Sequence, residues 1–559
     1  MEKSTDYNDI QEQSKGSHLD LEKYRGIFLT VIVSKVFERM LQARMKPNLD
    51  KVSLFQAGSR TGKGGADNLF LLRSSIDHSK YINRSIYITT YDFRQAFDSL
   101  WLQDCVLVLR KLGVEKYILK LIYEMNKKAV VQIKTPYGLT EPLDVTDIVK
   151  QGGVLGSPMC SATTAEYCEQ NRGISIGQAT IASLAFVDDI ADISASFEDA
   201  LKSHKNALKF ARRKKLQLAP DKCFIMLIKQ GNKEMKVPEL EVEGEKVQQV
   251  KLMKYLGDIF NEKGNNDDLV EDRAKRGTAS MVSIQGFMRE ASLGTHTLSV
   301  YLLLHNAIFI SSVIFNSEAW SNITEKNMST LTTIQLRYLK KMMDVRQATA
   351  NSFIYLELGI LPIKYEIHKR QISFLYHIVS LSENDPVKMV WRHQTELPEH
   401  KNWWCGVKKL MESYSIDYDE EAIKKMSKET FKRKVKTAIR NKAFEDLKND
   451  NASKSKTEYL TYDKFETQEY IKSMYPGAAK TILKCRAKTL KIKDHMKFKY
   501  SEYSCRWCGV SDETVEHIVN CGHSEERIEN VEQALLEMKM DKLSKIASRI
   551  DDFISKVEV

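Results

Sequence analysis

The sequence predicts an α+β protein in which short buried strands fall in the first half and amphipathic helices fill most of the second. Two short stretches, 184–187 and 190–193, apolar except for Asp192, flank a pair of acidic residues and have the length of buried strands. Between residues 267 and 382 apolar residues recur at helical spacing, as over 298–313 and 331–343. A chain of 559 residues that is 42% hydrophobic can build about three or four packed domains.

The acidic pair Asp188-Asp189 lies inside an apolar stretch, 181–193, and needs a physical reason. An ionised carboxylate is costly to bury unless it is paired or bound to metal, and two adjacent carboxylates also repel each other. A divalent cation held at the tip of a hairpin removes both penalties. The alternative is an ordinary polar turn, because Asp supports the backbone of turns.

Two upstream segments favour the metal site. An apolar and β-branched run, 87–91, ends on Asp92 and precedes a helical pattern that begins near Ala96, so a strand can deliver this carboxylate beside the hairpin. Mg²⁺ prefers one or two carboxylates together with phosphate oxygens. The glycine-rich segment 149–158 allows a ligand to approach the backbone closely, although taken alone it is better explained as a loop before a helix.

The order of these segments resembles the palm of reverse transcriptases, and most closely that of non-LTR retrotransposons. The matching residues are Asp92 with Ala96-Phe-Asp98, Gln151-Gly152 with Gly156-Ser-Pro158, and Phe186-Val-Asp-Asp189. Further matching segments are 24–27, 34–44, 56–60, 67–70, 216–222 and 254–257. The chain departs from the commoner family pattern at Val187 and in the Gly-Ser-Pro spacing, but both departures leave the carboxylates in place.

The resemblance implies a right-hand polymerase with fingers and palm of the reverse transcriptase type, a helical thumb and a small C-terminal zinc-binding segment. The implied domains are partial fingers at 1–80, a palm at 81–262, a thumb at 263–385, a helical basic connector at 386–500, a zinc knuckle at 501–525 and a C-terminal helix at 526–559. The reverse transcriptase domain itself would span about 15–262.

The family motifs also imply roles for individual residues. Asp92 and Asp188 would hold two Mg²⁺ or Mn²⁺ ions for in-line nucleotidyl transfer, with Asp189 supporting the site. The residues that match nucleotide-binding positions are Arg25, Phe97, Gln151 and Gly152, and those that match the segment holding the primer end are Tyr255, Leu256 and Gly257. For Phe97, which matches the aromatic that excludes a 2′-hydroxyl, the alternative role is a core aromatic.

The implied function is that of an RNA-directed DNA polymerase, which extends a primer 3′-hydroxyl with dNTP on an RNA template. The implied partners are the RNA template, a DNA primer or target, and dNTP. Complete family members carry an endonuclease, and neither the residues before Tyr24 nor those after Cys521 provide room for one. The matched fingers begin in their middle, at Lys15-Gly-Ser17. A catalytically defective or domesticated nucleic-acid-binding remnant is therefore the second hypothesis, and the sequence does not fix the oligomeric state.

The net charge of +11 fits a polyanionic partner, although the same surplus over 559 residues also fits plain solubility. Eight Lys or Arg residues lie between Lys480 and Lys499, interleaved with apolar residues, as a reader of a nucleic-acid backbone would need. A second basic run, 431–442, has apolar residues at helical spacing, so one face would pack and the other stay basic. A solvated helix face explains this second run equally well.

Near the C-terminus, Cys505, Cys508, His517 and Cys521 have the spacing Cys-x2-Cys, x8, His-x3-Cys. Four nitrogen and sulfur ligands at such short spacings suit one tetrahedral, structural Zn²⁺. His517 is a better ligand candidate than His523, because residues four apart share a helix face. The segment 513–521 also resembles the CCHC zinc knuckle of non-LTR proteins.

The cysteine count and the N-terminal residues predict a reducing compartment. The chain has nine cysteines, an odd number, and its first 15 residues are polar and charged, without a secretory pattern. No apolar run reaches the ~18 residues that a membrane span needs. An intracellular protein, nuclear or cytoplasmic and without a membrane partner, is therefore expected.

Overall fold

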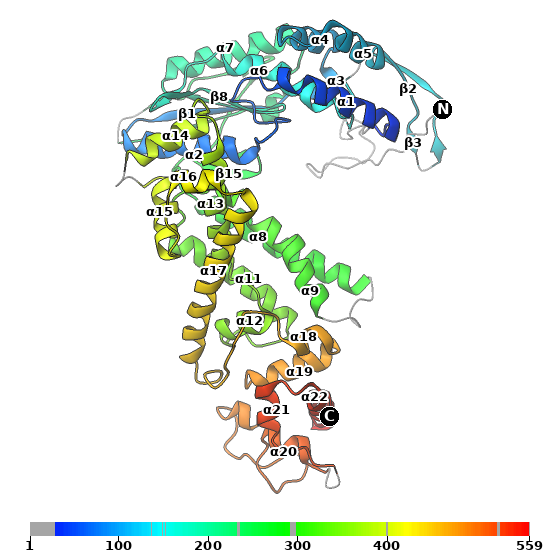
Figure 1. The fold of residues 1–559 in the computed structure, drawn as a ribbon, viewed down its shortest axis with the longest axis vertical. Helices are drawn as coiled ribbons and strands as arrows, with labels where there is room; N and C mark the ends of the chain where they lie inside the picture. The colour runs from blue at the N-terminus through cyan, green and yellow to red at the C-terminus, as the bar shows by residue number, and fades with distance from the viewer. Residues whose placement is uncertain are drawn as a thin grey trace. The chain divides into compact units, whose positions relative to one another are not determined.

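The computed structural model describes residues 28–135, 137–147, 149–150, 152–231, 235–290, 298–397, 401–522 and 526–557, without the side chain of Asp98. The chain divides into two compact units (Figure 1). Unit 1 comprises Met1–Asp268, Ala319–Asn322 and His377–Gly406. Unit 2 comprises Leu269–Glu318, Ile323–Tyr376 and Val407–Val559.

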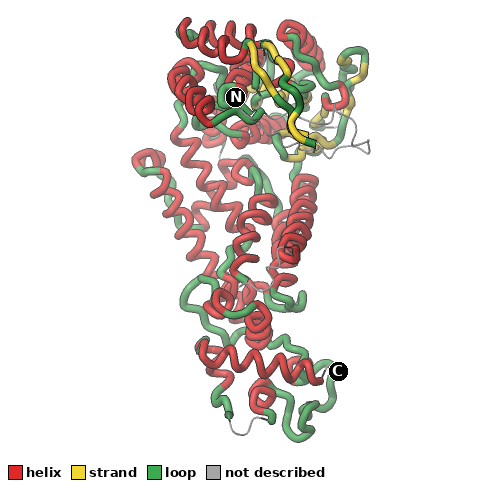
Figure 2. The backbone as a smooth tube through the Cα atoms, turned by 90° about the vertical axis from the view of Figure 1, so that its right-hand side faces the viewer, coloured by secondary structure: helices red, strands yellow, loops and turns green. Residues whose placement is uncertain are grey.

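Unit 1 contains every strand of the described ranges, and Figure 2 shows them gathered in one part of the chain while the rest is helical. The strands are β1 (Ile86–Tyr91), β2 (Lys128–Val131), β3 (Lys134–Thr135), β4 (Gly138–Leu139), β5 (Leu143–Thr146), β6 (Ile174–Ile176), β7 (Ala179–Ile181), β8 (Ser183–Phe186), β9 (Asp189–Ser194), β10 (Phe224–Ile228), β11 (Glu241–Val242), β12 (Glu245–Lys246), β13 (Gln248–Gln249), β14 (Leu252–Tyr255) and β15 (Asp258–Asn261). Its helices are α1 (Ile32–Leu49), α2 (Gly65–Tyr81), α3 (Ala96–Ser99), α4 (Leu102–Lys111), α5 (Lys116–Asn126), α6 (Gly156–Cys168), α7 (Phe197–Lys214) and α14 (Pro386–Thr395), with a 3-10 turn at Pro220–Lys222.

Unit 2 is helical in the ranges that the structure describes. Its helices are α9 (Ser299–Leu304), α10 (Ser311–Val313), α11 (Glu325–Met342), α12 (Asn351–Leu358), α16 (Glu420–Lys425), α17 (Lys428–Ala452), α18 (Glu469–Ser473), α19 (Pro476–Arg486), α20 (Val515–Asn520), α21 (Val531–Glu537) and α22 (Met540–Val557), with a π-helical stretch at His305–Ile310 and a 3-10 turn at Asp494–Met496. The helices α8 (Asp267–Glu290), α13 (Ile363–Ser380) and α15 (Trp403–Ser413), and a 3-10 turn at Ser317–Ala319, continue from one unit into the other. The α+β fold predicted from the sequence is confirmed.

The core of unit 1 is a five-stranded sheet with the strand order β13-β10-β1-β9-β8. The central strand β1 is buried along its whole length, and it pairs antiparallel with β10 on one side and β9 on the other. Its Ile and Thr side chains suit a central strand, because β-branched residues pack well on a pleated surface. Helix α6 contacts β8, and helix α7 contacts β9 and β1, so these helices cover the sheet.

Two segments far away in sequence complete unit 1. Helix α14 contacts α2, β6 and β7, and the Gln394 amide donates to the Ser74 hydroxyl of α2 at 2.9 Å. The buried Trp320 indole donates to Asp258 of β15 at 3.2 Å. The sequence predicts both segments in domains after the palm, whereas by these contacts they pack within the unit that contains the sheet.

The described helices were compared with the length and hydropathy that a membrane-spanning helix needs. None of them is both long enough and apolar enough to cross a bilayer.

Candidate active site

The predicted hairpin is formed by β8 and β9, and a two-residue turn at Val187-Asp188 closes it, because Phe186 pairs with Asp189. Val187 has a φ of +60°, whereas Asp188 is not among the residues with positive φ. A positive φ at the first central residue alone is the pattern of a type II′ turn, which normally has glycine there. A β-branched residue in this region is strained, so the surroundings must hold the turn in place.

Gln56 supplies that restraint from the segment before α2. Its side-chain oxygen accepts from the amides of Val187 and Gly58, both at 2.9 Å, and its side-chain nitrogen donates to the Val187 carbonyl at 3.0 Å. Gly58 must lack a side chain, because a Cβ there would lie 2.4 Å from the Val187 nitrogen. Gln56 lies in a segment that resembles non-LTR reverse transcriptases, 56–60, but the sequence alone did not indicate a role for it.

Asp92 follows β1 directly, as predicted. Tyr91 pairs with Ile190, so continuing the register by one residue sets Asp92 opposite Asp189 on the neighbouring strand. The Asp92 carbonyl accepts from the Ala219 amide at 2.9 Å, which fixes the backbone just past the strand. Asp92 and Asp188 are half-buried and Asp189 is exposed. The fold thus brings the three predicted carboxylates to one edge of the sheet, where solvent and ligands can reach them.

The surroundings of the carboxylates fit a divalent cation. Oxygen ligands from one or two Asp residues, with room for phosphate oxygens and water, are what Mg²⁺ prefers. Cys160 of α6 lies close to Asp188, and burial followed by the charge of Asp188 holds the pKa of its thiol well above the ordinary value. This thiol therefore stays neutral beside the acidic cluster.

The glycine-rich loop leads into α6 and is held by Glu38 of α1. The Glu38 carboxylate, 3% exposed, accepts from the amides of Val154 at 2.6 Å and Leu155 at 3.2 Å. A carboxylate is favourable there, because the start of a helix presents unpaired N–H groups and partial positive charge. Gly152 has a φ of +98°, which explains the glycine, whereas Gln151 lies outside the described residues.

The other predicted nucleotide-binding residues have mixed outcomes. Phe97 lies in the short helix α3, is half-buried, and packs against the core of unit 1. This position leaves both of its predicted roles open. Arg25 lies outside the described residues.

The segment predicted to hold the primer end is the β14–β15 hairpin. Leu256 and Gly257 have φ values of +46° and +85°, the pattern of a type I′ turn, and both are partly exposed. The preceding Tyr255 points inward, where its hydroxyl donates to the Leu184 carbonyl at 3.1 Å and accepts from Asn68 at 3.3 Å. Burial raises the pKa of Tyr255 well above its ordinary value, so this donor stays protonated. Leu252 and Lys254 are exposed, so one face of the hairpin and its tip are available to a ligand, whereas the Tyr255 side chain is not.

The other end of the hairpin turn is anchored by a buried ion pair. Asp258 is fully buried and accepts from the Arg73 guanidinium of α2 at 2.7 Å and from the Trp320 indole at 3.2 Å. A second Arg73 nitrogen donates to Asn266 at 2.6 Å. These contacts satisfy the charge of Asp258 and fix the hairpin to α2.

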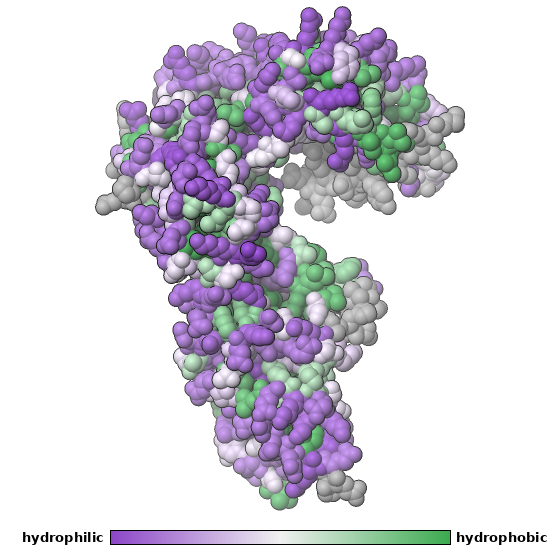
Figure 3. Space-filling view, in the orientation of Figure 1, coloured by the Kyte–Doolittle hydropathy of each residue, from purple (hydrophilic) through white to green (hydrophobic). Residues whose placement is uncertain are grey.

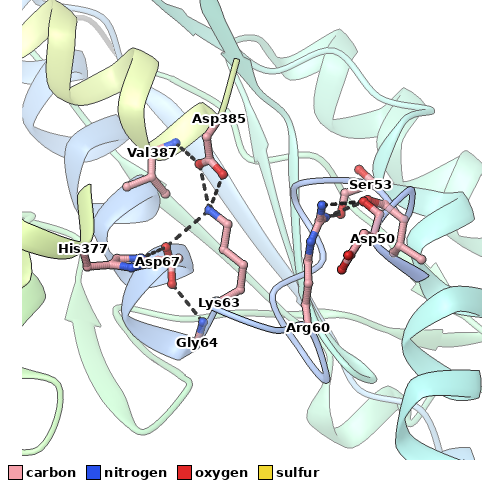
Figure 4. A network of polar contacts seen from close by, with 10 residues as sticks. Asp50, Ser53, Arg60, Lys63, Gly64, Asp67, His377, Asp385 and Val387 are labelled. Carbon is pink, nitrogen blue, oxygen red and sulfur yellow. Dashed lines mark hydrogen bonds and ion pairs between the residues drawn. The ribbon is translucent and has the colours of Figure 1, made fainter. Parts of the chain in front are cut away.

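A second polar network joins the start of α2 to the last turn of α13 and the segment that follows it (Figure 4). The Lys63 ammonium lies 2.6 Å from Asp385 and 3.4 Å from Asp67, and these three side chains are only 4–5% exposed. His377 contacts Asp67 at 2.8 Å. Burial alone would raise the pKa of Asp67, but the hydrogen bond from His377 and the charges of His377 and Lys63 lower it overall. No local sequence signal predicted this network, because Lys63 and Asp67 lie more than 300 residues from their partners Asp385 and His377.

In the same view, the Arg60 guanidinium donates to the backbone carbonyls of Asp50, Val52 and Ser53 at 2.7–2.9 Å (Figure 4). Burial lowers the pKa of Arg60, with the charges of Asp385 and Asp50 opposing that shift. A cation that caps three carbonyls fixes the loop between α1 and Gln56. Arg60 therefore fixes the segment that leads to Gln56. We call the three hydrogen bonds of the Gln56 side chain with Val187 and Gly58 the Gln56 clamp.

In unit 2, the structure brings the four predicted zinc ligands together. The ligand atoms of Cys505, Cys508, His517 and Cys521 all lie within 4.8 Å of one another. Thr514 caps α20 by accepting from the His517 amide at 3.1 Å, which orients that histidine. The backbone amides of Ser511 and Val510 lower the pKa of the Cys508 thiol to about 6. This donor set fits tetrahedral Zn²⁺, and the alternative ligand His523 lies outside the described residues.

The basic stripe predicted between Lys480 and Lys499 is not one continuous surface. Arg486 is buried and pairs with Glu357 at 2.9 Å, and Lys484 pairs with Asp344. Lys491, Lys497 and Lys499 remain exposed. The prediction of an exposed stripe is wrong for Arg486, because a partner 129 residues earlier takes this cation into the core.

The comparisons with known proteins agree with the resemblance seen in the sequence. Residues 11–260 match the family described as "Reverse transcriptase (RNA-dependent DNA polymerase)". Over 261 residues the chain is 23% identical to the "Retrovirus-related Pol polyprotein from type-1 retrotransposable element R2" of Nasonia vitripennis. That alignment covers 44% of this chain and 25% of the relative, so the chain spans about a quarter of the length of this curated relative.

Among solved structures, the chain resembles telomerases only weakly. A telomerase from Candida albicans, in complex with a TWJ fragment of telomeric RNA, is 13% identical with a TM-score of 0.33, over 72% of this chain and 63% of the other. The apo telomerase from Candida tropicalis is 12% identical with a TM-score of 0.34, over 66% and 67%. The assignment rests instead on the family match and on the carboxylates gathered at one sheet edge. The chain contains a reverse transcriptase domain, which covers residues 11–260.

Proposed function

We propose that this chain is an RNA-directed DNA polymerase of the non-LTR retrotransposon type. The observation that carries the proposal is the position of Asp92, Asp188 and Asp189 at one sheet edge, inside the region that matches the reverse transcriptase family. The relative from the R2 element supports the retrotransposon class. The partners would be an RNA template, a DNA primer or target, and dNTP.

The proposed chemistry is in-line transfer of a nucleotide to a primer 3′-hydroxyl. Asp92 and Asp188, supported by Asp189, would hold two Mg²⁺ or Mn²⁺ ions, which lower the pKa of that hydroxyl and neutralise the departing pyrophosphate. The Gln56 clamp keeps Asp188 and Asp189 at the tip of a strained turn, which orients the site before substrate arrives. The exposed tip Leu256-Gly257 would hold the primer end.

The remaining predicted roles belong to the same proposal. Phe97 and Gly152 would line the nucleotide pocket together with Arg25 and Gln151. Cys505, Cys508, His517 and Cys521 would hold one structural Zn²⁺ as a CCHC knuckle, which the close approach of their ligand atoms supports. In domain terms, residues 1–80 would be partial fingers and 81–262 the palm. A thumb at 263–385 and a basic connector at 386–500 would follow, then the knuckle at 501–525 and a last helix at 526–559.

The experiment is primer extension on an RNA template with dNTP and Mg²⁺. An Asp188→Asn variant should lose at least about a thousandfold in rate, because a metal ligand supports several kcal/mol of transition-state stabilisation. Asp144→Asn is the matched control, since Asp144 is an exposed carboxylate of β5 whose side chain is 63% accessible. Equal extension by Asp188→Asn and wild type, or none by either, would favour the nonenzymatic nucleic-acid-binding hypothesis.

A further inference from the structure

One helix of unit 2 carries charge that the fold does not use. Helix α17 buries one row of side chains, among them Phe431, Val435 and Ile439. Six basic side chains are exposed at the end of α16 and in the N-terminal half of α17. They are Lys425, Lys428, Lys432, Arg433, Lys434 and Lys436. Glu429 is the one acidic residue among the twelve from 425 to 436. In Figure 3 the side where Figure 1 shows α17 is largely hydrophilic.

The six basic side chains form what we call the α17 basic surface. Among the described residues, the structure gives none of them an ion pair or a hydrogen bond. The second half of the same helix behaves differently, because each lysine there has an acidic neighbour: Lys442 with Asp446 at 3.1 Å and Lys448 with Glu445 at 3.6 Å. Lys454, two residues after the helix ends, likewise pairs with Asp450 at 3.0 Å. One helix therefore has a neutralised half and a strongly basic half.

The α17 basic surface works against the stability of its own helix. Lys428 is the first helical residue, where the helix dipole disfavours a cation. Lys428, Lys432 and Lys436 are four residues apart, so like charges face each other on one side of the helix. Helix α7 shows the opposite arrangement, since acidic residues lie in its first turn and three cations in its last turn, as the dipole favours, and Lys214 pairs with Glu166 at 2.7 Å. An arrangement that costs folding energy indicates a partner outside the chain.

We infer that the α17 basic surface binds the phosphate backbone of a duplex nucleic acid, at a site separate from the carboxylates of unit 1. The row from Lys428 to Lys436 spans about 12 Å along the helix. A duplex carries about one phosphate charge per 1.7 Å of its axis, so several phosphates lie within reach of the row. Lysine suits this task, because its ammonium is a point charge on a flexible stem that meets phosphates without reading base sequence.

A protein receptor for basic peptides is the competing partner. A receptor that takes an extended peptide would have to pull Phe431, Val435 and Ile439 out of the core, where they are 0–2% exposed. A duplex meets the same cations while the helix stays folded. The packing of α17 therefore favours nucleic acid.

The test is a salt titration of binding between the full chain and a labelled DNA duplex. The association constant falls as salt rises, and each phosphate contact adds about 0.9 to the magnitude of the slope of log K against log salt concentration. The variant K428Q/K432Q/R433Q/K436Q should therefore reduce the magnitude of this slope by about 3.6 if all four cations contact phosphates. The control K442Q/K448Q/K454Q removes three charges from the second half of α17 and the turn that follows it, and it should change the slope by less than about 1.

A charge-retaining variant, K428R/K432R/K436R, should bind with the wild-type slope, and this outcome would support the inference. The inference would be overturned if the first variant and the control changed the slope equally, or if the first variant kept the wild-type slope. If the first variant lost binding to a receptor for basic peptides but bound the duplex as the wild type does, the inference would also be overturned, in favour of the protein partner. Measured in the Asp188→Asn background, the result does not depend on whether the chain polymerises DNA.

Discussion

The Gln56 clamp predicts that the geometry of the acidic hairpin depends on one amide side chain. In a Gln56→Met variant the shape is nearly kept, but the amides of Val187 and Gly58 lose their acceptor. The Val187 carbonyl keeps a donor, the Thr164 hydroxyl at 2.5 Å. Each orphaned amide costs about 1–3 kcal/mol, so the strained turn loses about 2–6 kcal/mol of support.

Part of this loss can be avoided if the turn relaxes, since the positive φ of Val187 costs about 1–3 kcal/mol. The population of the strained turn then falls by about tenfold for each 1.4 kcal/mol. We therefore expect primer extension by Gln56→Met to fall at least about thirtyfold, and its unfolding midpoint in urea to fall as well.

A second substitution makes the reasoning testable. Glycine adopts positive φ at no steric cost, so Val187→Gly should restore part of the activity in the Gln56→Met background while changing the wild type little. The coupling in this double-mutant cycle should be about 1–2 kcal/mol. Activity of Gln56→Met within about threefold of wild type, or strictly additive effects of the two changes, would refute the clamp.

Three further predictions concern stability and metal content. Burial raises the pKa of Asp192 to about 7, so between about pH 4 and pH 7 the folded state holds a proton that the unfolded state releases, and stability should fall as pH rises through this window. Asp192→Asn keeps an acceptor for the Tyr167 hydroxyl and should flatten the pH dependence of the unfolding free energy measured in urea, whereas parallel curves would exclude the shift. Glu357→Gln leaves the buried Arg486 without its counter-ion and should cost about 3–5 kcal/mol in the same assay, more than Glu357→Gln combined with Arg486→Met; equal losses would argue against the ion pair. Elemental analysis should find about one zinc per chain in the wild type and in Asp188→Asn, and much less in Cys508→Ser; equal zinc in all three would rule out the Cys505 cluster as the site.

Local patterns were enough to predict the acidic site. A strand that ends on Asp92 and a hairpin around Asp188-Asp189 are both visible within about a dozen residues, and the sheet register then brings them together. The clustering of Cys505, Cys508, His517 and Cys521 was predictable for the same reason, because these residues lie within one short segment. The roles of Arg25 and Gln151 stay predictions, since these residues lie outside the described ranges.

Contacts between distant segments could not be predicted from one sequence. Gln56 and Val187 are 131 residues apart, and nothing near Gln56 indicates that its side chain meets a turn. The error over Arg486 has the same cause, since a basic residue among lysines resembles a surface charge until Glu357 is placed beside it. The packing of α14 on α2 likewise depends on partners such as Gln394 and Ser74, 320 residues apart.

Helix α2 sets a constraint on how this domain can vary in length. Asn68 donates to the Ala185 carbonyl of β8 and to the Tyr255 hydroxyl, while Arg73, five residues later, holds Asp258 on the far side of the β14–β15 turn. One added or deleted residue between them would rotate one contact by about 100° around the helix axis relative to the other. A single-residue insertion between Asn68 and Arg73 should therefore separate the acidic hairpin from the β14–β15 turn.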